Sequence, residues 1–359
     1  MAMNVFQELV PFSSIAFRLR MKLAMIELIR SILLLSSITI VFVIVCSVCT
    51  DQSPLDLLNK LLNVALSKQH FTDAVEAAIP LCLMAFAFSV PYLVGFINLG
   101  AEGQVSLGAL MASAVTITAS KYNINPLVNI LSSLFVAALV AVAWSAISVL
   151  LKLYLNVNEI VTTFILNALA LSVISILLTS KRLIWYNGDS QGLESISFQS
   201  QISSKPYSLH LQLTLIVIVF LIALTVTHAF IWWSSFGLRI RAVGGGFKTA
   251  LLCGINNRSS VFIAVSIAAV AAGIAGLDVL FRTGRFQADD FSGWGFEGIT
   301  IAILGRHKLL GIMLASVYMA VLKQFALSIQ GYGISYGSFL ILQAVCVFLY
   351  LFADRRKKV

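Results

Sequence analysis

Long apolar runs separated by short polar connections cover most of the chain. A membrane-crossing helix needs about 20 consecutive, mostly apolar residues, and ten runs reach or approach that length. These runs are residues 31–49, 74–97, 102–120, 127–151, 160–180, 211–234, 259–281, 296–305, 309–327 and 337–353. The pattern predicts an all-α, polytopic integral membrane protein with about ten transmembrane helices.

The eighth run, 296–305, is the short one. Ten helical residues rise only about 15 Å, so this run could re-enter the membrane from one side instead of crossing it. A crossing that draws its start from residues 291–295 is favoured, because it keeps the basic C-terminus on the cytoplasmic side.

Composition and charge agree with a membrane protein. Hydrophobic residues make up 59% of the 359 residues and charged residues only 11%, whereas soluble domains have about 25% charged residues. The net charge of +9 does not indicate nucleic acid, because basic residues collect in the cytoplasmic loops of such chains. We expect a cytoplasmic or interfacial lead-in at 1–30, one transmembrane domain at 31–353 and a basic cytoplasmic tail at 354–359, with both termini inside.

A basic connection at residues 235–258 separates two of the apolar runs. It contains four cations and no acid: Arg239, Arg241, Lys248 and Arg258. The three glycines at 244–246 predict a break, and residues 247–253 predict a short helix that ends at Gly254. A short, basic helix outside the bilayer is typical of a handle for another protein.

No stretch predicts a catalytic, metal or nucleotide site. A phosphate-binding loop at 242–249 would need glycine where Ala242 and Phe247 stand. The five cysteines lie mostly in apolar runs, where a buried thiol packs as a small hydrophobe. The four histidines are scattered without ligand-like spacing. We therefore expect no cofactor on this chain.

Polar residues inside the apolar runs are more informative, because each is costly in lipid. They gather at 98–108, at 157–167 and at 293–298. Helix capping and close packing of small residues would explain them, and so would a polar path through the membrane.

Four motifs occur in a fixed order along the chain. They are Asn-Leu-Gly-Ala-Glu-Gly-Gln at 98–104, Asn-Glu-Ile-Val-Thr-Thr-Phe-Ile-Leu-Asn at 158–167, Leu-Arg-Ile-Arg-Ala-Val-Gly at 238–244 with Ala250 and Gly254, and Gly-Phe-Glu-Gly-Ile-Thr-Ile-Ala-Ile-Leu-Gly at 295–305. Together they resemble the permease subunits of bacterial ABC importers in the ribose/branched-chain amino-acid superfamily. The versions at 98–104 and 158–167 are most similar to the nucleoside and simple-sugar branch, and the resemblance covers about residues 75–350.

The resemblance implies partners and a location. A separate cytoplasmic ABC ATPase would bind ATP and Mg²⁺, an extracytoplasmic binding protein would deliver substrate, and a second homologous permease, or a second copy of this chain, would complete the pore in the bacterial inner membrane. The 235–258 loop would couple the pore to the ATPase through Gly237, Arg239, Arg241, Ala242, Val243, Gly244, Phe247, Lys248, Ala250 and Gly254.

The chain departs from the family pattern in two places. Gly245 and Gly246 stand where a polar residue and an asparagine usually follow Gly244, which predicts a looser start of the short helix. His307 and Lys308 follow Gly305 where the family usually has a turn with Asn-Pro.

Two pairs of short matches suggest an inverted repeat of five plus five helices. Gly-Ala-Glu-Gly at 100–103 and Gly-Phe-Glu-Gly at 295–298 head runs that are five apart, and Ile-Leu-Asn-Ala at 165–168 matches Ile-Leu-Gln-Ala at 341–344. Transporters built this way hold substrate between the repeats, near the ends of discontinuous helices. The predicted pathway residues are Asn98, Glu102, Gln104, Asn167, Trp294, Phe296, Glu297 and Gln343.

A neutral, hydroxyl-rich substrate suits a path with amides and few fixed charges. The expected function is inward movement of a nucleoside by alternating access, with a simple sugar such as ribose or galactose as the alternative. An ion-coupled secondary transporter is disfavoured, because the acids lie mainly at the ends of the runs and the basic loop would have no purpose.

Overall fold

The computed structural model describes residues 53–179, 195–197 and 231–328, with a few isolated positions in 40–48 and at 330, 337 and 344. The chain divides into two compact units, Glu76–Val317 and the two flanking parts, Met1–Val75 with Tyr318–Val359. The lead-in, the tail and most or all of the runs 31–49, 211–234 and 337–353 lie outside the described residues.

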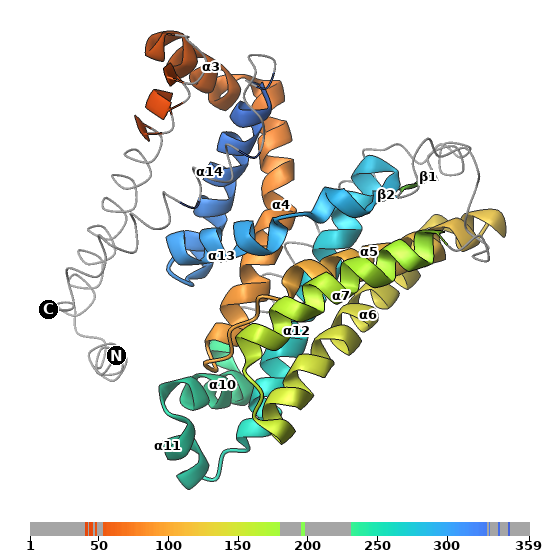
Figure 1. Cartoon of the computed structure of the whole chain (residues 1–359), viewed down its shortest axis with the longest axis vertical. Helices are drawn as coiled ribbons and strands as arrows, with labels where there is room; N and C mark the ends of the chain where they lie inside the picture. The colour runs from red at the N-terminus through yellow and green to blue at the C-terminus, as the bar shows by residue number, and fades with distance from the viewer. Residues whose placement is uncertain are drawn as a thin grey trace, which may run out of the picture. The chain divides into compact units, whose positions relative to one another are not determined.

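Helices in the described residues follow the predicted apolar runs within a few residues (Figure 1). They are α4 (Lys68–Tyr92), α5 (Ala101–Lys121), α6 (Pro126–Leu155), α7 (Glu159–Thr179), α12 (Asn257–Thr283), α13 (Trp294–Leu304) and α14 (Leu309–Ser328), with α10 (Ser235–Gly245) and α11 (Phe247–Leu252) in the basic loop.

The helix ends follow from local sequence. Asn125 accepts a hydrogen bond from the Leu127 N–H at 2.9 Å, and Pro126 takes the first helical position of α6, where its missing N–H costs nothing. Asn256 caps α12 in the same way, through the Ser259 N–H at 3.1 Å. Gly284 ends α12 in the left-handed conformation, at φ +64°.

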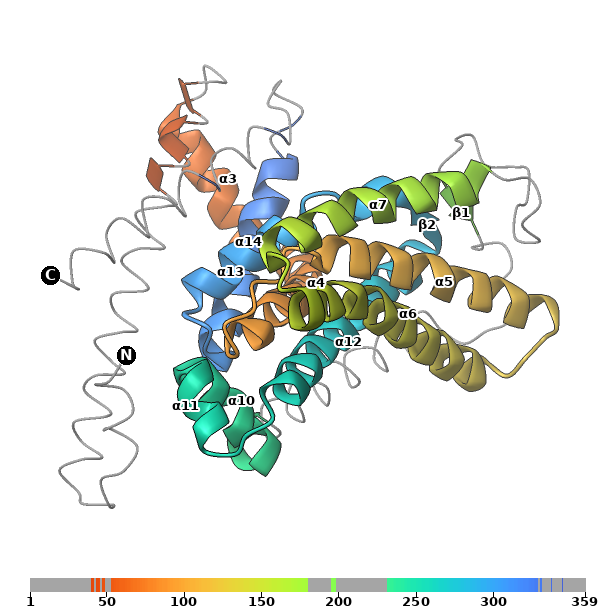
Figure 2. The ribbon, with the colours of Figure 1, turned by 60° about the horizontal axis from the view of Figure 1, so that its bottom comes forward.

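Helix α5 forms the centre of the unit Glu76–Val317. It packs against α6, α7 and α12, and most of its residues are buried (Figures 1 and 2). The helices approach closely at glycines: a Cβ at Gly276 would lie 2.7 Å from the Val105 carbonyl oxygen. Small residues allow this approach between helices in membranes.

Five of the described helices are long and apolar enough to cross a membrane: α4, α6, α7, α12 and α14. Helix α5 is not among them, although it has 21 residues, because polar side chains interrupt it. These side chains bond inside the protein, as Thr116 does with Ser133 at 2.9 Å. The protein is thus all-helical in its main architecture with at least five candidate spans, and the count of ten and the sidedness of the termini stay predictions.

Helix α13 begins within the predicted window 291–295. A short 3₁₀-helix, η1 (Ala288–Phe291), precedes it, and Gly293 turns the chain at φ +80°. Its 11 residues rise about 16 Å, roughly half of a hydrocarbon core.

The sequence pattern missed two elements. A two-stranded antiparallel sheet pairs β1 (Ser195–Ser197) with β2 (Arg285–Gln287), so the predicted outer connection 181–210 attaches to the end of α12. In the other unit, helix α3 (Pro54–Leu66) begins at Ser53, whose hydroxyl accepts from the Asp56 N–H. Leu57 is buried, whereas Leu55 and Leu66 are exposed.

Candidate functional site

The basic loop consists of two helices separated at one residue. The predicted break at 244–246 is wrong for Gly244 and Gly245, which continue α10; only Gly246 leaves the helix, in an extended conformation. The predicted stop at Gly254 is confirmed, at φ +75°. Gly246 provides no side-chain cap for α11, as expected for a glycine in place of asparagine.

The short helix α11 exposes an apolar surface. Phe247, Leu251 and Leu252 are 52%, 62% and 89% exposed, and Lys248 is exposed between them. Ala250 is buried on the opposite face, and Asn257 holds the start of α11 by donating to the Phe247 carbonyl oxygen at 2.7 Å. The exposed apolar surface therefore belongs to a helix whose opposite face is packed against the protein and whose start is held by Asn257.

Three of the four cations lie over aromatic rings. Arg241 lies 4.6 Å from the ring of Trp232, Arg239 lies 5.4 Å from Phe236, and Arg258 lies 5.3 Å from Tyr154 at the end of α6. Such contacts orient a guanidinium while leaving its charge near the surface. Of the other predicted coupling residues, Gly237 and Val243 are buried, and Ala242 and Gly244 are half-buried.

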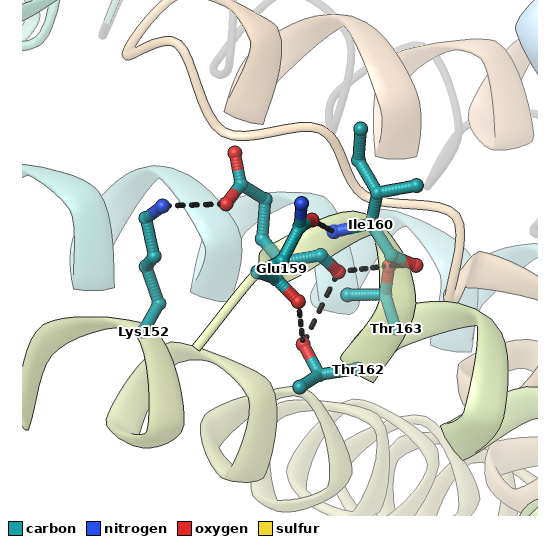
Figure 3. Close-up of polar contacts among 6 residues, drawn as sticks. Lys152, Glu159, Ile160, Thr162 and Thr163 are labelled. Carbon is teal, nitrogen blue, oxygen red and sulfur yellow. Dashed lines mark hydrogen bonds and ion pairs between the residues drawn. The ribbon is translucent and has the colours of Figure 1, made fainter. Parts of the chain in front are cut away.

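The turn between α6 and α7 explains the first half of the motif at 158–167 (Figure 3). The Asn158 side chain accepts from the Ile160 N–H at 2.9 Å and caps α7. Lys152 at the end of α6 lies 2.6 Å from the Glu159 carboxylate, so an ion pair closes the turn. The hydroxyls of Thr162 and Thr163 donate back to the Glu159 carbonyl oxygen.

The start of α5 is held by amide side chains. Asn98 accepts from the Gly100 N–H at 3.0 Å and donates to the Ala87 carbonyl oxygen at 3.3 Å. Gln104 and Asn98, both 1% exposed, also pair through their amides. Both predicted pathway residues therefore cap and brace a helix.

Asn167 joins α7 to the start of α5. Its oxygen accepts from the Gly103 N–H at 2.9 Å, and its nitrogen donates to the Leu99 carbonyl oxygen at 2.6 Å. The Leu99 N–H donates to the Thr163 hydroxyl at 3.2 Å. Thr163 was not among the predicted pathway residues, although the motif at 158–167 contains it.

Glu102 joins α5 to α13. Its carboxylate accepts hydrogen bonds from the backbone of Gly293 and Gly295, at the start of α13. Because the free N–H groups of a helix start favour a negative charge, Glu102 serves α13 as well as its own helix. The two helices extend from this junction in different directions (Figures 1 and 2). We call the meeting of these two helix starts the α5–α13 junction.

The remaining predicted pathway residues differ in exposure. Trp294 is 9% exposed and packs edge-on against Phe291 at 5.7 Å, and Glu297 is 2% exposed. Phe296 is 58% exposed. Gln343, and with it the second half of the predicted repeat, lies outside the described residues.

An ion network near the C-terminal end of α12 was not predicted. Arg282 holds the buried Asp278 with two hydrogen bonds of 2.9 Å and reaches Glu76 of α4 at 2.9 Å. Glu76 lies 206 residues from Arg282, so only the spacing of four between Asp278 and Arg282 was visible locally in the sequence.

His307 occupies the turn between α13 and α14, at φ +56°. Its ring stacks on Tyr92 at 4.4 Å, and its Nδ1 lies 3.1 Å from the Ser89 hydroxyl. Burial lowers the pKa of the His307 imidazole from its usual value. In the part of the chain that the structure describes, no group of three or more His, Cys, Asp or Glu residues could hold a metal ion.

Three known permeases are similar to this chain. A glucose ABC transporter permease, TsgB13 of Haloferax volcanii, is 26% identical over 88% of this chain and 84% of its own length. A guanosine permease, NupP of Bacillus subtilis, is 26% identical over 71% and 73%. A nucleoside permease, NupB of Lactococcus lactis, is 26% identical over 75% of each. No solved structure matches the chain significantly.

The model of one protein family matches residues 72–350, which include every helix from α4 to α14 except the first four residues of α4. The matched region contains the basic loop, the start of α5 and the α5–α13 junction. On this evidence the chain belongs to the family described as the permease component of the branched-chain amino acid transport system.

Proposed function

We propose that this chain imports a nucleoside by alternating access, as one of two permease subunits driven by a cytoplasmic ATPase. The substrate class rests on the similarity of the chain to relatives named as guanosine and nucleoside permeases, and the resemblance of the motifs at 98–104 and 158–167 to the nucleoside and simple-sugar branch supports the same class.

As an ABC importer permease, the chain forms the membrane path and is not itself catalytic, and ATP is bound by the partner ATPase. ATPase and binding-protein partners follow generally from the family. The second permease, homologue or copy, belongs to the proposal.

The surface of α11 supports contact with the ATPase. Its exposed Phe247, Leu251 and Leu252 would enter an apolar cleft of the ATPase, and Lys248 is exposed between them. The cleft should therefore carry acidic residues at its rim, since charge complementarity fixes the register of an interface.

Exchanging one exposed cation tests this contact. Lys248→Glu should release the ATPase during gentle purification, whereas Lys121→Glu, an exposed lysine at the end of α5, should retain it. Normal recovery of the ATPase with Lys248→Glu would contradict the proposed contact.

A simple sugar is the second candidate, because the glucose permease relative covers 88% of this chain. Uptake of labelled guanosine, uridine, ribose and glucose by cells with and without the gene distinguishes the two. The proposal expects ATP-dependent uptake of a nucleoside that excess sugar does not inhibit. Uptake of sugar alone would support the second candidate, and uptake that persists after ATP depletion would overturn both.

A further inference from the structure

Helix α10 contacts the connection between α4 and α5 backbone to backbone. Gly244 lies in the last turn of α10, and a Cβ built there would overlap the carbonyl oxygen of Leu93. The neighbouring Gly245 has no atom within 4 Å of the same position. Only the absence of a side chain at 244 allows the basic loop to approach this connection.

The connection at residues 93–100 is irregular but firmly held. The N–H groups of Val94 and Phe96 both donate to the Pro91 carbonyl oxygen, at 3.0 and 3.1 Å, and both side chains are buried. Asn98 then bonds back to Ala87 of α4 and forward to Gly100. Close-packed segments of this kind transmit strain because they compress little.

The far end of the connection meets the α5–α13 junction. Thr163 and Asn167 of α7 hold the N–H and the carbonyl oxygen of Leu99, and three residues later Glu102 binds the start of α13. Every link from Gly244 to α13 is thus a backbone contact or a hydrogen bond to a backbone group.

We propose that residues 93–100 carry the movement of the basic loop to the α5–α13 junction, with Gly244 and Thr163 as positioning residues at the two ends of this connection. The inference rests on the proposed function, because it needs an ATPase that moves α10 and α11. A backbone contact suits this task, since no flexible side chain absorbs the displacement.

The chain offers a matched pair of variants at each end. Gly244→Ala forces α10 away from Leu93, whereas Gly245→Ala adds the same methyl group into open space. Thr163→Val removes the acceptor of the Leu99 N–H, whereas Thr162→Val removes a hydroxyl that bonds only the carbonyl oxygens of Asn158 and Glu159.

The experiment measures ATP hydrolysed per labelled nucleoside imported, in proteoliposomes that contain the complete importer and its binding protein. Gly244→Ala and Thr163→Val should raise this ratio about fivefold or more, within the usual range of coupling between sites. Their controls should keep the wild-type ratio, and the ATPase should stay bound in all four variants.

A wild-type ratio in both test variants would overturn the inference while leaving the proposed function intact. If Gly244→Ala does not insert, Thr163→Val decides alone, because it retains every contact of α10. If no ATPase accompanies the wild-type protein, the proposed function fails instead, and with it the inference.

Discussion

Glu102 at the start of α5 lies against Gly295 at the start of α13, and its carboxylate accepts a hydrogen bond from the Gly295 backbone. A helix start normally satisfies its free N–H groups with its own cap. Here Gly293, which precedes α13, has no side chain to do so. A residue almost 200 positions earlier in the sequence supplies the acceptor, so a carboxylate of α5 serves the start of α13.

Replacing Glu102 should therefore impair transport, because the change removes a contact of α5 and also the acceptor at the start of α13. A hydrogen bond to a charged group contributes about 1.5–3 kcal/mol, so Glu102→Ala should lower substrate uptake by about tenfold or more at equal expression. Glu102→Gln keeps an acceptor without the charge, so its uptake should lie between that of wild type and that of Glu102→Ala. Equal uptake by all three proteins would show that the junction does not depend on this carboxylate.

Asn167 should contribute mainly to stability. Asn167→Ala leaves the Gly103 N–H and the Leu99 carbonyl oxygen without their partner, and each lost partner costs about 1–3 kcal/mol. We expect a clearly lower unfolding temperature in detergent, measured by tryptophan fluorescence. Ser172→Ala on the exposed side of α7 is the control and should change stability by less than about 0.5 kcal/mol. A tolerated Asn167→Ala would mean that water replaces the amide.

The helix boundaries could be predicted because they depend on neighbouring residues. Gly254 ends the short helix where the sequence pattern expected it, and Pro126 and Asn256 lie at the starts of α6 and α12, close to the predicted apolar runs 127–151 and 259–281. Gly244 misled the prediction, because a glycine can mark close packing as well as a break. Its contact with Leu93 lies about 150 residues away in the sequence and has no local signal.

The candidate pathway residues show the same difference between what the local sequence indicates and what depends on distant partners. Asn98, Gln104 and Asn167 were recognisable as costly polar residues inside apolar runs, but their bonding partners were not. The structure uses them to brace the start of α5, which is the capping alternative that the sequence left open. That role is compatible with a pathway that passes nearby, and of the predicted residues in the described ranges Phe296 is the largely exposed one.

Arg282 should be necessary for a stable protein. Arg282→Ala leaves Asp278, whose side chain is fully buried, without its counterion, and breaking a buried ion pair from one side costs about 3–5 kcal/mol. The double variant Asp278→Asn with Arg282→Gln removes both charges and should unfold at a higher temperature than Arg282→Ala. Glu76→Gln should have a small effect, because the Glu76 side chain is 37% exposed. An Arg282→Ala protein as stable as the double variant would contradict this account.

His307 should make stability depend on pH in the acidic range. Burial lowers the pKa of its imidazole in the folded protein below the usual value of about 6.5, and the flanking Arg306 and Lys308 add no negative charge that would favour a proton. The unfolded chain therefore binds a proton first as the pH falls. The stabilising contribution of neutral His307 is complete above about pH 6.5 and is lost as the pH falls through the folded pKa. His307→Asn does not titrate, and asparagine tolerates the left-handed backbone at this position. The difference in unfolding temperature between wild type and His307→Asn should stay constant from pH 7.5 to about pH 6.5 and shrink from there to pH 5. A difference that stays constant down to pH 5 would show that burial does not lower the pKa of this imidazole.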